Sequence, residues 1–560
     1  MIDRVPWKGP DLYGVATIKS CYESILFGEF PCVIPILSNS VFGDEGPLFS
    51  WIVSYSAFFY NISLVNFTGK EITIDFLDDF ARVFQIIFVI FGLFFLWGGT
   101  KILALRRESR PVDPLGIGPN AQKFSINIAT CTTLLALSCL GLVMQWHEVG
   151  STGLSFFFQS ICFFALCETP EKPGKSGKLF AFGSFGLLLT SDFSIFFSFW
   201  LASIVICLTS YPWNLVKKKF IITTHVFLIL FFFFSYIALF NENTYLMYAS
   251  WIENQFLISK FQPWHLIKTW LWTWWPLWPI VVALFLKINT YEFWNSPNIK
   301  LPLILLFFLT AFPLLGIFAS NETKFIPIVP LAVLSTFGLL TLPRKVAKII
   351  DWFALSIFSI IAVIIWSYWI TLHTGIPYDL YQDIIRAAPN TSGKFNYSEV
   401  ILGVFATISW LFLVIWRIKT RTPNLWRPVV LSAGGLALMW TLLMTLWGPA
   451  LNINRGFSNI QKNINQKINL EGEFTKENCL NINKHDHRSR AIVLAYTNFK
   501  ISNNEECNYF LERKTKKNKS TNFNNNLNIN EWKIIWKGHR LSDPRGVETF
   551  TLFKKVTHHY

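Results

Sequence analysis

A series of long apolar segments, separated by short polar loops, constrains this chain more than any other feature of its sequence. A helix needs about 20 apolar residues to cross the hydrocarbon core of a bilayer. Hydrophobic residues make up 52% of the 560 residues, which is more than a water-soluble core would need. We therefore predict an all-α polytopic membrane protein with about twelve transmembrane helices, at 82–100, 126–145, 152–167, 178–191, 193–210, 220–240, 271–287, 301–319, 326–342, 352–371, 400–417 and 428–447.

Lys and Arg are distributed unequally between the loops, and this distribution predicts the orientation of the chain. Cytoplasmic loops of membrane proteins carry an excess of both residues. The net charge of +15 then mostly reflects membrane topology, and we expect no nucleic-acid partner. The basic loops, which we assign to the cytoplasm, lie at 101–123, 172–178, 217–219, 287–300, 344–348 and 417–427.

This orientation divides the chain into three predicted regions. Residues 1–81 form an outer region with interfacial helices, residues 82–447 a transmembrane domain, and residues 448–560 a soluble outer domain. The apolar stretch at 49–64 contains Ser, Tyr and Asn, so we interpret it as an interfacial helix and not as a further span.

The last region is rich in Asn, Lys and Glu, so we expect it to fold in water. Residues 517–530 have the composition of a flexible loop, and 455–469 should be helical. Together these patterns predict a small α/β domain. β-Branched and aromatic residues predict its strands at 490–499, 507–514, 531–540 and 548–555.

The nine cysteines fall into two groups. Five lie within or beside the predicted spans, where they are small apolar fillers. The other four lie in the outer regions, where an oxidising compartment permits disulfides. We therefore expect a bridge between Cys479 and Cys507 and another between Cys21 and Cys32; free buried thiols are the alternative.

Several short outer segments resemble the motifs of one enzyme family. With the many helices and the C-terminal outer domain, they resemble the bacterial family 39 membrane glycosyltransferases of the C superfold. That family includes the lipid A aminoarabinose transferase and the protein mannosyltransferases. The segments are DLYGVATIKSCYESILFGEF (11–30), DEGPLFSW (44–51), LLLTSDFSIF (187–196), WIENQF (251–256), TKFIPIVPLAVL (323–334) and GHRLSDPRGVETFTLFKK (538–555).

The resemblance implies a reaction and a location. Such enzymes move a sugar from a polyprenyl phosphate to an acceptor lipid, glycan or protein, with inversion at the anomeric carbon. The acceptor hydroxyl loses a proton as it attacks, so a carboxylate is needed as general base. The leaving phosphate gains charge, so a cation is needed, either a divalent metal ion or Lys/Arg. The chain would be a multi-pass protein of the bacterial inner membrane, with its C-terminal domain in the periplasm.

Within this resemblance, Asp11 matches the general base of the family. Glu45 matches the acidic residue of the Glu-Lys-Pro turn, where it could bind a metal ion. Lys324 stands where the family has Arg and would contact the donor phosphate. Asp44 has no family counterpart, and the alternative for the pair Asp44 and Glu45 is a solvated turn before Gly-Pro.

Five further residues are candidates. His147 and Glu148 end a predicted span and could bind a metal or orient a hydroxyl, but adjacent helical residues point about 100° apart and chelate poorly. Capping of the helix end is the alternative. His265 and Lys268 share a helical face and could contact phosphate, or else anchor the helix at the interface. Glu253 matches the acidic residue of the family's Trp-x-Glu-His.

The chain also departs from the family, which opens two other functions. Gly46, Ser191, Asn254 and Phe325 replace the family's Lys, Lys, His and Tyr, each of which would handle phosphate or metal. The chain also begins at the family's first outer loop, so we expect either a longer natural start or a protein that works without the first span. A non-catalytic descendant of the enzyme fold is therefore one alternative, and a transporter of lipid or glycan is another.

Overall fold

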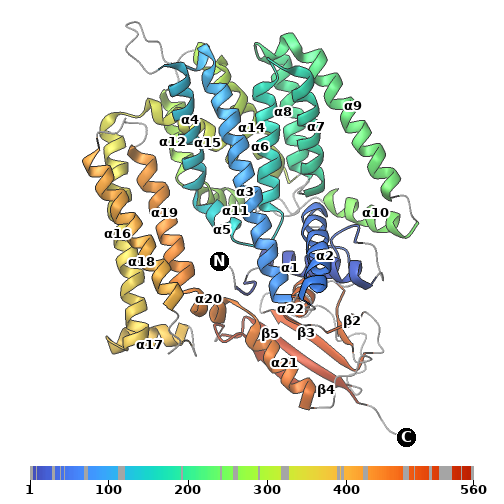
Figure 1. Cartoon of the computed structure of the whole chain (residues 1–560). Coiled ribbons are helices and arrows are strands. Elements are labelled where there is room, and N and C mark those ends of the chain that lie inside the picture. Colours follow the sequence, from blue (N-terminus) through green and yellow to red (C-terminus); the bar gives the residue numbers. More distant parts are fainter. Residues whose placement is uncertain are drawn as a thin grey trace.

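Helices form most of the molecule, and a small sheet lies at its C-terminal end (Figure 1). This arrangement agrees with the predicted class, a helical membrane protein with a small C-terminal α/β domain. The structure is a computed structural model of the chain, and it describes residues 4–7, 9–27, 32–37, 40–42, 45–68, 74–110, 120–190, 193–239, 242–256, 263–287, 291–316, 327–387, 391, 397–420, 427–470, 479–484, 486–497, 499–502, 507–515, 532–543 and 545–556.

The main helical bundle is organised around α3 (Ile74–Leu105), which packs along α6 (Thr152–Glu168). Close approach of these two helices depends on glycine: a Cβ at Gly92 would lie 2.6 Å from the Phe156 ring, and one at Gly99 would lie 2.8 Å from the Phe163 ring. The other helices of the bundle are α4 (Ala121–Leu137), α5 (Leu140–Trp146), α7 (Pro173–Thr190), α8 (Phe193–Thr209), α9 (Trp213–Leu239), α10 (Glu242–Phe256), α11 (Pro263–Thr273), α12 (Leu277–Lys287), α13 (Tyr291–Asn295), α14 (Pro297–Leu314) and α15 (Ile328–Thr341).

Seven helices among the described residues are long and apolar enough to cross a membrane, or up to nine if each of two bent pairs is one span. The predicted total of about twelve therefore stays a prediction. One of the seven is Leu48–Val65, within α2 (Leu48–Thr68), where we expected an interfacial helix. In Figure 1, α2 lies beside α1 (Gly9–Phe27) at the end of the bundle that carries the sheet.

Two predicted spans, 126–145 and 271–287, are broken helices, which corrects the sequence prediction. The axis bends by 68° between α4 and α5 and by 98° between α11 and α12. The two breaks bond to each other: Leu140 N donates to Trp275 O at 3.0 Å, and Cys139 Sγ donates to Thr273 O at 3.2 Å. Backbone groups released from the helices are thereby satisfied in an apolar surrounding, where unpaired groups are costly.

The described parts of the basic loops gather at the end of the bundle opposite the sheet (Figure 1). There, Lys and Arg side chains bond to the last carbonyls of helices from other parts of the chain. Lys300 Nζ donates to Thr209 O at 2.7 Å, Arg106 Nη2 donates to Cys167 O at 3.2 Å, and Lys287 donates to Thr341 O. Cations at helix C-termini are favourable because the terminal carbonyls carry partial negative charge. The predicted basic loops thus share one end of the molecule, while its assignment to the cytoplasm stays a prediction.

Three long helices form a separate unit, which we call the satellite unit. It consists of α16 (Arg344–Thr374), α18 (Tyr397–Lys419) and α19 (Arg427–Leu446), with the short α17 (Tyr378–Ala387) across one end (Figure 1). Its buried residues, which include Trp410 and Leu438, form a hydrophobic cluster of their own. At one end Arg417 Nη2 lies 2.5 Å from Asp351 Oδ2 and joins α18 to α16.

The C-terminal part, which we call the tail domain, combines three helices with a mixed five-stranded sheet of order β2-β1-β3-β5-β4. Strand β1 is parallel to β2 and β3, and β5 is antiparallel to β3 and β4. The elements are α20 (Gly448–Arg455), α21 (Ser458–Leu470), β1 (Leu480–Ile482), α22 (His487–Tyr496), β2 (Ile501–Ser502), β3 (Tyr509–Thr515), β4 (Trp532–His539) and β5 (Glu548–Lys555).

Three of the four strands predicted in the tail domain are confirmed, and one prediction is wrong. Segments 507–514, 531–540 and 548–555 contain β3, β4 and β5, whereas most of 490–499 belongs to helix α22. Asp486 caps this helix by accepting a hydrogen bond from Ser489 N at 3.2 Å. The apolar residues that suggested a strand are buried along α22, which packs between the sheet and α1 (Figure 1). Tertiary packing therefore overrides the local preference for a strand.

Buried cations hold the tail domain to the bundle. Lys19 of α1 donates to Leu494 O at 2.9 Å and also to Thr497 O, at the end of α22. Arg490 of α22 donates to Leu37 O at 3.1 Å. Because both side chains are almost fully buried, these bonds are formed away from water and fix the position of α22.

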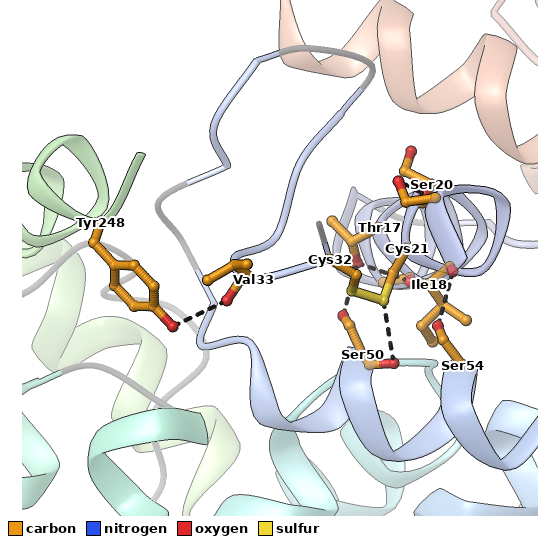
Figure 2. The surroundings of a disulfide bond; sticks show 11 residues. Thr17, Ile18, Ser20, Cys21, Cys32, Val33, Ser50, Ser54 and Tyr248 are labelled. Carbon is orange, nitrogen blue, oxygen red and sulfur yellow. Dashed lines mark hydrogen bonds between the residues drawn. A yellow bond between two sulfur atoms is a disulfide. The ribbon is translucent and has the colours of Figure 1, made fainter. Parts of the chain in front are cut away.

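Both predicted disulfides are present, Cys21–Cys32 and Cys479–Cys507. Figure 2 shows the first of them between α1 and the loop that follows it. Beside it, Ser54 Oγ of α2 donates to Ile18 O at 3.0 Å and ties the two helices together. Tyr248 of α10 donates to Val33 O at 3.2 Å, so two adjacent residues of the loop are held, Cys32 by α1 and Val33 by α10.

Candidate functional site

Asp11 lies in the first turn of α1 and has no exposed surface. Its Oδ2 accepts hydrogen bonds from Arg4 Nη2 at 2.6 Å and from Trp7 N at 3.1 Å. Its Oδ1 accepts one hydrogen bond, from Val149 N at 2.8 Å. The same oxygen lies 4.0 Å from Arg82 Nη2, which is an ion pair without a hydrogen bond. The carboxylate therefore joins the N-terminal segment, α1, α3 and the turn before α6.

Two buried arginines surround this carboxylate. Burial lowers the pKa of Arg4, and the nearby charge of Asp11 opposes that shift, so the pair is best described as an ion pair. Arg82 on α3 also pairs with Asp79, whose Oδ1 lies 3.1 Å from Nη1. Arg82 Nε and Nη2 have no hydrogen-bond partner among the described residues. Unpaired buried donors are uncommon, so this guanidinium is a candidate to bind an oxygen atom of a substrate.

Glu45 approaches the same turn from another direction. Its side chain is largely buried, and a Cβ added to Gly150 would lie 3.5 Å from Glu45 Oε1. Asp11 binds Val149 N, so the two carboxylates meet consecutive residues just before α6. Helix N-termini favour negative charge. The structure thus brings together the two carboxylates that the family resemblance indicated, while their chemical roles remain predictions.

The turn that carries Glu45 packs tightly against the end of α7. Gly46 N donates to Thr190 O at 3.3 Å, and a Cβ at Gly46 would overlap the carbonyl oxygen of Leu189. Trp251 of α10 donates from Nε1 to Glu45 O at 3.2 Å. A lysine like that of the family therefore has no room at position 46 unless the backbone of α7 moves. Replacing Gly46 by Lys would test packing more than chemistry.

His147 and Glu148 directly precede Val149, whose N–H binds Asp11, and the contacts favour the capping alternative for the histidine. His147 Nδ1 bonds to Val143 O at 3.2 Å, one turn back along α5. Its ring packs against the Trp440 ring, with centroids 4.7 Å apart, and its carbonyl accepts from Arg4 at 3.0 Å. Glu148 is also buried, and its charge, like that of Asp11, opposes the lowering of the Arg4 pKa by burial.

The remaining candidates lie elsewhere or outside the described residues. Glu253 on α10 is exposed, as are His265 and Lys268 on α11, and no contact within the described part of the chain joins them to Asp11. Asp44 and Lys324 lie outside the described residues, and so do Ser191 and Phe325. Their predicted roles therefore stay predictions.

The surroundings of Asp11 do not suit a divalent metal ion. Arg4 occupies Oδ2 and Arg82 stands 4.0 Å from Oδ1, so two cations already face this carboxylate and would repel a third. Among the described residues, no group of three or more His, Cys, Asp or Glu side chains could hold a metal. We therefore derive the chemistry of Asp11 without a metal ion.

Sequence reasoning missed several residues of the site. The sequence predictions include neither Arg4 nor Arg82. Arg82 stands at the edge of a predicted span, where an ionisable residue is itself a signal of function. Gln85, one turn after Arg82 on α3, is fully buried; its Nε2 donates to Thr152 Oγ1 at 2.6 Å, and its Oε1 accepts from Gly153 N at 3.2 Å. The Gln85 side chain thereby caps the N-terminus of α6.

Comparisons with known proteins support the fold. No family model matches the sequence, and no curated protein matches it. The structure is similar to ArnT from Cupriavidus metallidurans bound to undecaprenyl phosphate, with a TM-score of 0.57, 12% identity and coverage of 98% of this chain and 95% of that one. The apo state of the same protein gives a TM-score of 0.56 at 12% identity, covering 98% and 94%. The chain therefore has an ArnT-like fold along nearly its whole length.

Proposed function

We propose that this protein is an integral membrane glycosyltransferase that uses a polyprenyl-phosphate-linked sugar as donor. The acceptor would be a lipid, glycan or protein at the outer face of the bacterial inner membrane. The observation that carries the proposal is the convergence of Asp11 and Glu45 on one buried turn, within a fold that is shared with an undecaprenyl-phosphate-bound protein.

We assign the base function to one oxygen of Asp11, and the hydrogen bonds of its carboxylate support this choice. Each carboxylate oxygen can accept about two hydrogen bonds. Oδ2 already accepts two, from Arg4 and Trp7, whereas Oδ1 accepts one, from Val149 N. Oδ1 is therefore the atom that takes the proton of the acceptor hydroxyl.

Arg82 completes the arrangement for the attacking oxygen. Its Nη2 lies 4.0 Å from Oδ1, a separation that one hydroxyl oxygen can bridge with a hydrogen bond to each group. That oxygen then forms a bond to the anomeric carbon while the bond between this carbon and the phosphate oxygen breaks. The electron pair leaves with the polyprenyl phosphate, and the proton goes to Oδ1. Asp11 is fully buried, so acceptor binding must include a movement that opens the site.

Substitution of the base tests this proposal. In a reconstituted assay, Asp11→Asn should lower sugar transfer by about 10²-fold or more while donor lipid still binds, as expected for loss of a positioned base. Asp383→Asn is the matched control, because Asp383 is exposed on α17, which crosses one end of the satellite unit. Equal activity of the Asp11 variant and the control would reject the assignment.

Glu45 and Lys324, which we assign to the phosphate of the donor, give a second test. Glu45→Gln should weaken donor binding more than it lowers the rate of chemistry, because we assign this residue to the phosphate end of the donor. Lys324→Met should behave in the same way if that cation meets the leaving phosphate. A rise in donor KM without a fall in kcat supports these roles, and a fall in kcat alone contradicts them.

A non-catalytic lipid-binding protein of the same fold is the second candidate. The observation in its favour is Gly46, which leaves no room for the family's lysine. Lipid binding without any transfer would support it. The transporter alternative gains little from the two broken helix pairs, because the groups freed at the breaks bond to each other and not to a substrate path.

A further inference from the structure

Residues 4–7 are held between Asp11 and the tail domain. On one side, Arg4 and Trp7 N bind Asp11 Oδ2. On the other side, Tyr496 Oη of α22 donates to Pro6 O at 2.7 Å, and Trp7 Nε1 donates to Asn452 Oδ1 of α20 at 2.7 Å. A segment of four residues therefore connects the tail domain to the proposed general base.

Residues 4–7 and the tail domain are closely packed against each other. Tyr496 Oη also accepts from Phe457 N at 3.1 Å, so the hydroxyl bridges two backbone groups. Burial raises the pKa of Tyr496, which keeps the hydroxyl protonated and able to donate. A Cβ at Gly456 would lie 3.0 Å from Val5 Cγ2 and 3.3 Å from Tyr496 Oη. The chain after α20 thus packs directly on residues 4–7.

We propose that Tyr496 and Asn452 are positioning residues for Asp11, which they reach through residues 4–7. This inference rests on the proposed function. Arg4 and Trp7 N fill both acceptor positions of Oδ2 and so leave Oδ1 for the substrate. If the tail domain released the segment, the carboxylate would lose the bonds that fix its orientation. The tail domain therefore belongs to the catalytic apparatus, although no residue of it contacts Asp11 in the described part of the chain.

The kinetic test compares variants of the two positioning residues with a variant that loosens the tail elsewhere. Tyr496→Phe and Asn452→Leu should each lower kcat by about 10-fold, because small misplacements of a catalytic group are costly. The donor KM should stay within about twofold, since these residues do not bind donor. Asn452→Asp keeps the acceptor for Trp7 Nε1 and should restore most of the rate. Replacing both Cys479 and Cys507 by Ser loosens the tail domain away from α20, α22 and residues 4–7, so kcat of this variant should match the wild type.

A labelling test measures the same link without any activity. A Val5→Cys reporter should react with a small thiol reagent several-fold faster in the Tyr496→Phe background than in the background that lacks the Cys479–Cys507 disulfide. Equal labelling rates, or equal losses of kcat in the two backgrounds, would overturn the inference. If the wild type shows no transfer but the labelling rates differ as expected, the link to the tail domain stands and the proposed function fails.

Discussion

The helical bundle and the tail domain together form what we call the main body. The main body and the satellite unit bury their apolar residues in two different ways. In the main body one hydrophobic core runs from the bundle into the tail domain, so that Leu12 of α1, Phe163 of α6 and Leu552 of β5 belong to the same cluster. The satellite unit has a separate core, although its helices are as apolar as those of the bundle. Composition along the chain therefore indicates which solvent a segment meets, and not which segments pack together.

The polar contacts of the main body also differ from those of the satellite unit. Lys19 and Arg490 join the tail domain to the bundle through buried bonds to backbone carbonyls. The satellite unit instead has an ion pair at one end, between Arg417 and Asp351. We expect the tail domain and the bundle to lose structure together, and the satellite unit to respond on its own. Four tests, taken from the largest expected effect to the smallest, address this comparison.

Arg490→Met should have the largest effect. Arg490 is fully buried and donates to the carbonyls of Leu37, Ile482 and Asn483, which would all be left without this donor. We expect a loss of about 4 kcal/mol in the free energy of unfolding. Arg417→Met in the satellite unit should lose about 3 kcal/mol, because it breaks a single ion pair whose two side chains keep only about a tenth of their surface exposed. Unfolding followed in detergent would contradict the comparison if the satellite variant were the less stable.

Replacing both Cys479 and Cys507 by Ser should come next. This disulfide closes a sequence separation of 28 residues and should contribute about 3 kcal/mol. Limited proteolysis should then release fragments of the tail domain, and the bundle should become less stable at the same time because the core is continuous. Cleavage in the tail with an unchanged bundle would show that the two parts are independent.

Two glycines offer a matched pair with a smaller effect. A Cβ at Gly46 would overlap a backbone carbonyl of α7, whereas one at Gly435 would overlap the Phe358 side chain in the satellite unit. A side chain can rotate away and a helix backbone cannot. Gly46→Ala should therefore destabilise by about 2 kcal/mol and Gly435→Ala by about 1 kcal/mol or less. The order of the two melting temperatures is the measurement, and a reversed order would contradict the argument.

Arg386→Ala should have the smallest effect. Arg386 pairs with Asp383 on α17, and both side chains are well exposed. Exposed pairs usually contribute about 0 to 1 kcal/mol, so we expect no resolvable change in the melting temperature. A clear loss of stability would show that α17 supports the satellite unit more than its contacts indicate.

Sequence patterns predicted the helical membrane class and most strands, since both depend on local composition. The two disulfides were predictable because four cysteines lie in the regions assigned to the outer side. They could not predict the broken helices. The hydrogen bond that stabilises one break joins residues 134 positions apart, Cys139 and Thr273, and nothing near either residue specifies its partner. Helix α22 was mistaken for a strand for a related reason, because its packing against α1 decides its conformation.

Only those residues of the candidate site that lie in the family's motifs could be predicted from the sequence. Asp11 and Glu45 came from the family resemblance, and the structure places both at one turn. Arg4 and Tyr496 belong to no motif, and they act through contacts with segments that are distant in sequence. Their importance follows from geometry that only the folded chain provides.

The mutual bonding of the two broken helices also has a consequence for how the protein is made. Synthesis proceeds from the N-terminus, so the break before Leu140 enters the membrane long before Trp275 exists to accept its N–H. An unsatisfied N–H in lipid costs several kcal/mol, so α4 and α5 cannot settle into their final geometry until α11 and α12 have been inserted. Assembly of this region is therefore delayed by the order of synthesis, and substitutions around Pro276 should first appear as misinsertion of spans that were translated much earlier.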